Sequence, residues 1–116
     1  TAPINIYGIS KAQAEKDVLK INENSLIIRT SSFFGPWDNY NFAHHTREAL
    51  CSGQTVKAAD DVTVSPTYVP DLVNNSLDLL IDSMSGIIHL TNQGQISWAD
   101  WARNAAFTFG KSSQLV

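Results

Sequence analysis

The sequence lacks the features that mark several large classes of protein. Cys51 is its single cysteine, which excludes an internal disulfide, disfavours a thiolate metal site and fits a reducing cytoplasm. No apolar run approaches the roughly 20 residues that cross a bilayer. The eight lysines and arginines are scattered and the formal net charge is −3, so no basic stripe suggests nucleic acid. We expect a cytoplasmic protein that binds neither membrane nor nucleic acid.

Glycines and histidines are present but do not gather into sites. The six glycines are dispersed and form no glycine-rich turn of the kind that holds a dinucleotide. The three histidines have no metal-ligand companions, and the adjacent His44 and His45 would point about 100° apart on a helix. We therefore predict no metal site. The chain also opens at Thr1 without an initiator Met, a basic segment or a signal-peptide core, so we expect it to be part of something longer.

Helical and strand-like patterns alternate along the chain, which predicts an α/β fold with a mostly parallel sheet. Hydrophobic spacing, caps and breakers predict helices over about 7–23, 41–52, 70–81 and 97–109, with Gly53 and Gly110 as stops. Strands are expected at 26–28, 56–59 and 87–91, with a loop over 33–40 and an extended segment over 60–68. We interpret residues 1–116 as one domain. Its three or four strands are few for a sheet with helices on both faces, so part of that sheet is expected to be missing.

Burial is predicted from the same patterns. The strand at 26–28 is expected to be buried on both faces, and His89 to be a core side chain. Trp98 and Trp101 are expected in the core, and Arg29 is expected to pair with a carboxylate. The inward stripe of the third helix is predicted to comprise Leu72, Val73, Ser76, Leu77, Leu80 and Ile81.

Tyr7 and Lys11 are the first candidates for chemistry. Four residues apart on a helix, they share one face. A nearby ammonium favours the phenolate, so the pair could exchange a proton with a hydroxyl or carbonyl. The structural alternative is a packed tyrosine beside a lysine whose stem covers apolar surface.

An ordered series of segments accompanies this pair. They are Tyr7-Gly8-Ile9-Ser10-Lys11 with Glu15, Leu26-Ile27-Ile28-Arg29-Thr30-Ser31, Phe34-Gly35-Pro36, Asn41-Phe42, Ser65-Pro66-Thr67-Tyr68, Asp71-Leu72, Gly86-Ile87-Ile88-His89-Leu90 and Ser97-Trp98. The series resembles the extended short-chain dehydrogenase/reductase family, and within it the dTDP-4-dehydrorhamnose reductases of dTDP-L-rhamnose synthesis. The resemblance implies the C-terminal portion of a Rossmann-like parallel sheet plus the small substrate-binding region.

The resemblance also implies roles for individual residues. Tyr7 would give a proton to the 4-keto oxygen of a nucleotide-linked sugar as hydride arrives from NADPH or NADH. Lys11 would lower the Tyr7 pKa and bind the nicotinamide ribose, beside which Thr30 and Ser31 would lie. Substrate-binding positions would be Ser32, Asn41, Phe42, Pro66, Thr67 and Tyr68. From the residues alone, Thr30 and Ser31 could simply end a strand and Asn41 could be only a helix cap.

The chain departs from the family in three places. The family's glycine-rich turn and its carbonyl-polarising Ser or Thr would precede Tyr7, so we expect the chain alone to be inactive and to require an N-terminal half. Ser32 stands where these reductases usually have a Trp, and Asp60-Asp61-Val62 replaces the more usual Asp-Gln start. These two departures suggest either that the pocket holds another sugar or that the assignment to dTDP-rhamnose synthesis is one branch off. Apolar faces left without the missing half would favour self-association, so a homo-oligomer is one expected state.

Three functions remain open from the sequence. The first is the reductase of a nucleotide-linked 4-keto-6-deoxy sugar. The second is a sugar-nucleotide epimerase or dehydratase on the same scaffold. The third is a non-catalytic regulatory subunit resembling that of methionine adenosyltransferase, against which the intact Tyr7 and Lys11 argue.

Overall fold

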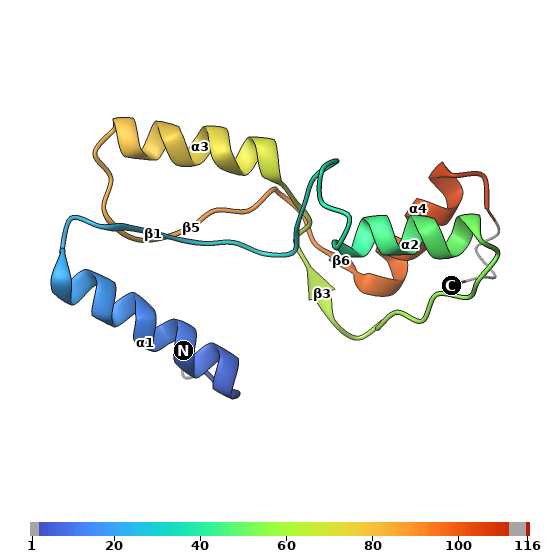
Figure 1. The fold of residues 1–116 in the computed structure, drawn as a ribbon, viewed down its shortest axis with the longest axis horizontal. Coiled ribbons are helices and arrows are strands. Elements are labelled where there is room, and N and C mark those ends of the chain that lie inside the picture. Colours follow the sequence, from blue (N-terminus) through green and yellow to red (C-terminus); the bar gives the residue numbers. More distant parts are fainter. Residues whose placement is uncertain (1–2, 112–115) are drawn as a thin grey trace. The chain divides into compact units, whose positions relative to one another are not determined.

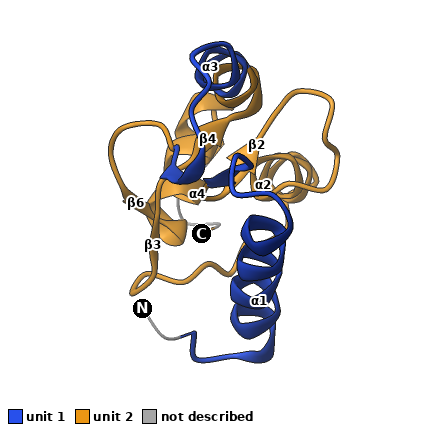
Figure 2. Ribbon diagram, turned by 90° about the vertical axis from the view of Figure 1, so that its left-hand side faces the viewer, with its two compact units in different colours: residues 1–29, 74–90 blue, residues 30–73, 91–116 orange. Residues whose placement is uncertain are grey.

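The computed structural model describes residues 3–111 and 116, and it confirms the predicted α/β class. The chain divides into two compact units, one formed by residues 1–29 and 74–90 and the other by residues 30–73 and 91–116 (Figure 2). Each unit is described below by itself. The interpretation of residues 1–116 as a single domain stays a prediction.

The first unit is built on two parallel strands. β1 (Leu26–Arg29) pairs in parallel with β5 (Gly86–His89), so that Leu26 lies opposite Gly86 and Arg29 opposite His89. The helix α1 (Ile6–Ile21) and the C-terminal part of α3 (Val69–Ile81) lie on opposite sides of this pair (Figure 1). A parallel pair with a helix on each side is the layered arrangement that the alternating sequence predicted.

The second unit contains the core. β2 (Phe33–Phe34) pairs in parallel with β4 (Thr67–Tyr68), and β3 (Thr63–Val64) pairs antiparallel with β6 (Ile96–Ser97). The helices α2 (Phe42–Cys51) and α4 (Trp98–Thr108) pack against each other. The buried apolar side chains of the described residues all come from these two helices; they are Leu50, Ala99, Ala102 and Ala106. Small alanines on α4 let the two helices approach closely.

Local capping signals fix the ends of the helices as predicted. The side chains of Asn41 and Ser97 cap α2 and α4, accepting the backbone N–H groups of His44 at 2.8 Å and Asp100 at 3.0 Å. After the helices, Gly53 and Gly110 adopt φ values of 70° and 62°, the left-handed conformation that ends many helices. These boundaries depend on a few neighbouring residues, which is why the sequence predicts them.

Two predictions about extended segments are wrong. Residues 56–59 form no strand, because the Ala59 carbonyl accepts the Ala99 N–H at 3.0 Å at the start of α4 instead of joining a ladder. The segment from Phe33 to Tyr40 is not entirely loop, since β2 opens it by pairing with β4. In both places the outcome depends on a partner that is distant in the sequence.

Three predictions about burial are also wrong. β1 is half-buried along its length, and His89 is exposed instead of buried. Of the predicted stripe on α3 only Leu72 and Ser76 are half-buried, whereas Val73, Leu77, Leu80 and Ile81 are exposed; the other half-buried residues of the helix are Val69, Pro70 and Leu79. The cause is that a sheet of only two strands covers a narrow strip of each helix that packs on it, and each helix in turn covers the strands only in part. None of the described helices is both long and apolar enough to span a membrane.

The exposed apolar side chains of the first unit predict self-association. Ile6 and Ile21 of α1 and Leu77, Leu80 and Ile81 of α3 are all more than half exposed. We expect the isolated chain to sediment as concentration-dependent dimers or larger species, and Leu77→Glu with Ile81→Glu to shift it toward monomer. Analytical ultracentrifugation measures both. A wild-type chain that stays monomeric at high concentration contradicts the prediction.

A buried hydroxyl on α2 predicts a stabilising substitution. Thr46 is 2% exposed, and its Oγ1 has no hydrogen-bond partner among the described residues. Thr46→Val removes the unsatisfied group and keeps the shape, so we expect the free energy of unfolding to rise by about 1 kcal/mol. Thr46→Ala removes the same hydroxyl but leaves a cavity, so we expect this variant to have a lower free energy of unfolding than wild type. Urea unfolding followed by circular dichroism tests the pair, and equal effects of both variants would contradict the explanation.

Candidate active site and nucleotide-sugar site

Tyr7 and Lys11 lie together on the first turns of α1, as their spacing predicts. The Lys11 ammonium lies 5.5 Å from the centroid of the Tyr7 ring, and the Tyr7 residue is 71% exposed. Lys11 is exposed as well, and no carboxylate pairs with it among the described residues. An exposed phenol beside an unpaired ammonium is available to a ligand on the surface of this unit.

Asn5 and Gly8 determine where α1 begins and therefore where Tyr7 lies. The Asn5 side chain caps the helix by accepting the Gly8 N–H at 2.7 Å. A Cβ at position 8 would lie 2.8 Å from the Pro3 Cβ and 3.2 Å from the Asn5 Oδ1. The glycine in the Tyr-Gly-Ile-Ser-Lys segment is thus required by the close approach of the chain that leads into the helix.

A two-pronged ion pair joins α1 to β1 within the first unit. Arg29 donates from Nε to Glu15 Oε1 at 2.8 Å and from Nη2 to Glu15 Oε2 at 2.6 Å, which confirms its predicted pairing with a carboxylate. The hydrogen bond from Arg29 holds the pKa of the Glu15 carboxyl below its usual range, and the same bond raises the pKa of Arg29. Glu15 lies one helical turn beyond Lys11, so this contact orients the face that carries Lys11.

The residues that follow β1 belong to the second unit. Thr30 is exposed, whereas Ser31 is half-buried and its Oγ lies 3.4 Å from the Ser65 N–H, which donates to it. Ser32 has a φ of 32°, a left-handed conformation that is uncommon outside glycine, and its carbonyl accepts the Thr67 N–H at 3.3 Å. Ser31 and Ser32 are therefore held against the segment that contains Pro66, Thr67 and Tyr68.

Asn41 does more than cap α2. Its Nδ2 donates to the Asp38 carbonyl at 2.6 Å and to the Gly35 carbonyl at 3.3 Å, so one amide fixes both the helix start and the preceding loop. Asn41 lines a cavity of about 390 Å³ whose wall carries the basic side chains His44 and Arg47 of α2 and one acidic side chain, Asp38. Backbone N–H groups at a helix N-terminus together with basic side chains suit an anionic ligand.

Thr67 is placed inside the second unit and not on a ligand-facing surface. It is 1% exposed; its hydroxyl donates to the Ser65 carbonyl at 3.0 Å and lies 3.4 Å from the Asn92 N–H. The Asn92 side chain in turn accepts the Tyr68 N–H at 3.1 Å. The sequence reasoning missed Asn92. Asn92 comes shortly after β5, just as Thr30 comes directly after β1. Because parallel strands end at the same edge of a sheet, this position could have marked Asn92 as a residue near Thr30.

The aromatic side chains of α2 and α4 form a cluster that includes Phe42. The centroid of the Phe42 ring lies 4.7 Å from that of Trp98 and 5.2 Å from that of Trp101. The two indoles stack with their centroids 5.5 Å apart and an interplanar angle of 22°. Phe34 contacts Trp101 edge-on at 5.7 Å. Trp98 and Trp101 are half-buried, and together with Phe42 they line a second cavity of about 250 Å³.

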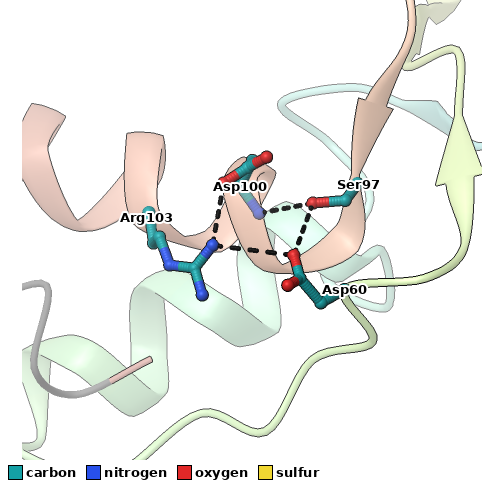
Figure 3. Close-up of polar contacts among 4 residues, drawn as sticks. All are labelled: Asp60, Ser97, Asp100 and Arg103. Atoms are coloured by element: carbon teal, nitrogen blue, oxygen red, sulfur yellow. Dashed lines mark hydrogen bonds and ion pairs between the residues drawn. The ribbon is translucent and has the colours of Figure 1, made fainter.

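A polar network fixes the start of α4 (Figure 3). Arg103 donates to Asp100 at 2.8 Å and lies 3.7 Å from Asp60, while Ser97 donates to Asp60 at 3.4 Å. The hydrogen bonds of Arg103 and then of Ser97 hold the pKa of the Asp100 carboxyl below its usual range. Asp60 therefore ties the segment before β3 to α4, and its side chain lies at the surface.

No group of three His, Cys, Asp or Glu suited to a metal occurs within the described residues.

The predicted site residues thus fall into two groups. Tyr7 and Lys11 lie together in the first unit, whereas Thr30, Ser31, Ser32, Asn41, Phe42, Pro66, Thr67 and Tyr68 lie in the second. Hydrogen bonds link Ser31, Ser32 and the Ser65–Tyr68 segment, and Asn41 and Phe42 share the aromatic cavity with Ser32. Each group is described within its own unit.

Comparison with known proteins identifies the class to which these features belong. The solved structures that the chain resembles are Rossmann-type extended short-chain dehydrogenases/reductases. Within that class, the RmlD substrate binding domain matches residues 1–116, and the chain belongs to this family.

Individual relatives agree with the family. The chain is 32% identical over 117 residues to a dTDP-4-dehydrorhamnose reductase of Mycolicibacterium smegmatis, covering 100% of this chain and 36% of the relative. It is 29% identical over 119 residues to a probable low-salt glycan biosynthesis reductase of Haloferax volcanii, covering 99% of this chain and 40% of the relative. The chain thus spans between a third and two fifths of the length of these proteins.

Solved structures show the same fold. A dTDP-4-dehydrorhamnose reductase of Bacillus anthracis, determined in complex with NADP, superposes with a TM-score of 0.88 at 32% identity, covering 96% of this chain and 39% of that one. A dTDP-glucose 4,6-dehydratase of the same organism superposes with a TM-score of 0.85 at 16% identity, covering 97% of this chain and 39% of that one, and this likeness concerns the fold alone.

The Arg29–Glu15 pair predicts a pH dependence of stability. Because the folded-state pKa of Glu15 is lowered, the pair stabilises the fold above the unfolded pKa, near 4.3, and this contribution is lost as the pH falls through the folded pKa. We expect wild type to be more stable than Glu15→Gln at pH 7, and the difference to shrink as the pH falls below the unfolded pKa of the carboxyl. Urea unfolding over a series of pH values measures this difference. A difference that persists at low pH would show that the carboxylate charge is not responsible.

Proposed function

We propose that this chain is the sugar-nucleotide-binding part of an NAD(P)H-dependent reductase of a nucleotide-linked 4-keto-6-deoxy sugar, of the dTDP-4-dehydrorhamnose type. The observation that carries the proposal is the family match over residues 1–116 together with Tyr7 and Lys11 on one exposed face of α1. The intact pair favours an enzyme over a non-catalytic subunit of the same fold.

Tyr7 and Lys11 act as a proton donor and its electrostatic partner. The Tyr7 hydroxyl donates a proton to the 4-keto oxygen of the sugar, so that a carbonyl becomes a hydroxyl. The Lys11 ammonium, within 6 Å of the ring, stabilises the phenolate that remains and so makes the proton transfer easier at neutral pH. The nicotinamide cofactor, when bound, supplies the hydride that the carbonyl carbon receives.

The residues present fit only the nicotinamide end of such a cofactor. Lys11 is exposed and has no carboxylate partner among the described residues, which leaves its ammonium available to ribose hydroxyls. Thr30 and Ser31 follow β1 at the carboxyl end of a parallel strand, where α/β proteins bind ligands. The dispersed glycines supply no turn for the pyrophosphate. The remaining contacts must come from the segment that precedes this region in its longer relatives.

The second unit holds the substrate. The N-terminus of α2, with His44 and Arg47 lining the same cavity, provides a favourable site for the diphosphate. Asn41 keeps the helix start and the loop before it in place, and Tyr68 contributes to the cavity wall. Thr67 acts from inside, by fixing the Ser65–Tyr68 segment that shapes the wall.

Substitution of the catalytic pair in the full-length protein tests the proposal. We expect Tyr7→Phe to lower kcat for a dTDP-linked 4-keto sugar by at least ~100-fold, because the proton donor is removed while the ring remains. Lys11→Met should lower kcat and raise the KM for the nicotinamide cofactor. Lys16→Met, which removes an exposed lysine from the same helix, is the matched control. The 116 residues alone should not reduce the sugar.

The readout is oxidation of the nicotinamide cofactor followed by absorbance. Full activity of Tyr7→Phe would reject Tyr7 as the proton donor. Reduction of the sugar by the isolated chain would reject the requirement for the preceding segment. A full-length protein that binds the nucleotide sugar without reducing it would instead favour the epimerase or non-catalytic alternatives.

A further inference from the structure

Glu15 is the acidic residue on α1 whose position suits an ion pair with Lys11. A helical side chain faces the residues three and four positions away. Around Lys11 these residues are Tyr7, Gly8, Ala14 and Glu15, and only the last is acidic. Lys11 and Glu15 also line one cavity of about 250 Å³ between α1 and β1. A Lys11–Glu15 ion pair is therefore within reach of the two side chains.

The described part of the chain does not contain that ion pair, because Arg29 binds both oxygens of Glu15. The two hydrogen bonds, from Nε at 2.8 Å and from Nη2 at 2.6 Å, engage the whole carboxylate. The hydrogen bond and charge of Arg29, with a smaller effect of His89, lower the pKa of the Glu15 carboxyl, and Lys11 is not among the causes. The Lys11 ammonium lies instead 5.5 Å from the centroid of the Tyr7 ring.

Without Arg29, the Glu15 carboxylate would lack its cation. Its side chain is only 18% exposed, and a poorly hydrated carboxylate is costly to leave unpaired. Lys11 is the lysine one helical turn away on the same face. An ammonium that turns toward Glu15 stabilises the Tyr7 phenolate less and is withdrawn from the ribose hydroxyls of a cofactor.

We propose that Arg29 is a positioning residue for the reaction, because it holds both oxygens of Glu15 and so keeps this carboxylate away from Lys11. The Lys11 ammonium is thereby left free for Tyr7 and for the nicotinamide ribose. The proposal rests on the proposed function, which takes Tyr7 as the proton donor and Lys11 as its electrostatic partner. It extends that function to Arg29, which acts on the reaction through other side chains.

A double-mutant cycle in the full-length protein separates this role from a purely structural one. Arg29→Met leaves Glu15 charged and unpaired, so we expect kcat to fall about tenfold and the KM for the cofactor to rise. Glu15→Gln removes the charge and keeps an amide oxygen for Arg29, so its loss of activity should be smaller. In the double variant no carboxylate remains to capture Lys11, so it should be more active than Arg29→Met. If Arg29 only ties α1 to β1, the double variant is at most as active as Arg29→Met, and the proposal is overturned.

A separate variant places a free carboxylate beside Lys11 and leaves the Arg29–Glu15 pair intact. Ala14 is exposed on α1, three residues from Lys11, and lines the same cavity. We expect Ala14→Glu to lower kcat several-fold, whereas Ala14→Gln, the matched control, stays near wild type. Equal activities of these two variants would overturn the proposal, even where Arg29→Met fails to fold.

Titration of Tyr7 gives a readout that does not require the reaction. The ultraviolet absorbance of phenolate is recorded against pH for each protein and for its Tyr7→Phe counterpart, and the difference isolates Tyr7. We expect the midpoint to move upward by about one pH unit in Arg29→Met, because the phenolate loses its cation, and to return toward wild type in the double variant. His89, opposite Arg29 on β5, is the remaining ionisable group beside the pair and is unchanged in every variant.

These outcomes distinguish the role of Arg29 from the proposed reaction. If the midpoints move as expected but no 4-keto sugar is reduced, the positioning role stands and the reductase function fails. If the midpoint of Arg29→Met equals that of wild type, the positioning role is overturned, whether or not the sugar is reduced.

Discussion

The paired hydrogen bonds between Arg29 and Glu15 are the constraint on which the position of Tyr7 and Lys11 depends. None of the described residues of α1 is buried, so the helix cannot be placed by a deep apolar contact. The ion pair fixes it instead to β1, which is held in register by β5. Glu15, Lys11 and Tyr7 follow one another at four-residue intervals along α1. Orienting Glu15 therefore orients the face that carries Tyr7 and Lys11.

The second unit is stabilised differently, through side chains that hydrogen-bond to the backbone. Asn41 joins a loop to the start of α2, and Asn92 and Thr67 join the segment after β5 to β4. The strands of this unit are too short for a long ladder of backbone hydrogen bonds. These amide and hydroxyl side chains instead hold the irregular backbone segments in one conformation. The two cavities of this unit lie among these segments and the aromatic cluster of α2 and α4.

The sequence predicted the features whose causes are local. The helix caps at Asn41 and Ser97, the stop at Gly53 and the family itself were all readable from neighbouring residues or from ordered motifs. Features that depend on distant partners were not. Residues 56–59 have a strand-like pattern, but the Ala59 carbonyl is used at the start of α4. The inward stripe of α3 was too wide because the sequence does not show how many strands the helix covers. The sequence did not single out Asn92, because its contacts with Thr67 and Tyr68 depend on the pairing of β5 with β1.

The sequence by itself determined the α/β class, the Tyr7–Lys11 spacing and the membership in a family of sugar-nucleotide reductases, because these follow from periodicity and from motif order. The tertiary structure alone decided which carboxylate pairs with Arg29, that Thr67 is buried inside the second unit, and that Ser32 borders an aromatic cavity which Asp38 also lines. Each of these depends on residues far apart in the chain. Their proximity is set by packing and pairing, which a linear pattern does not record.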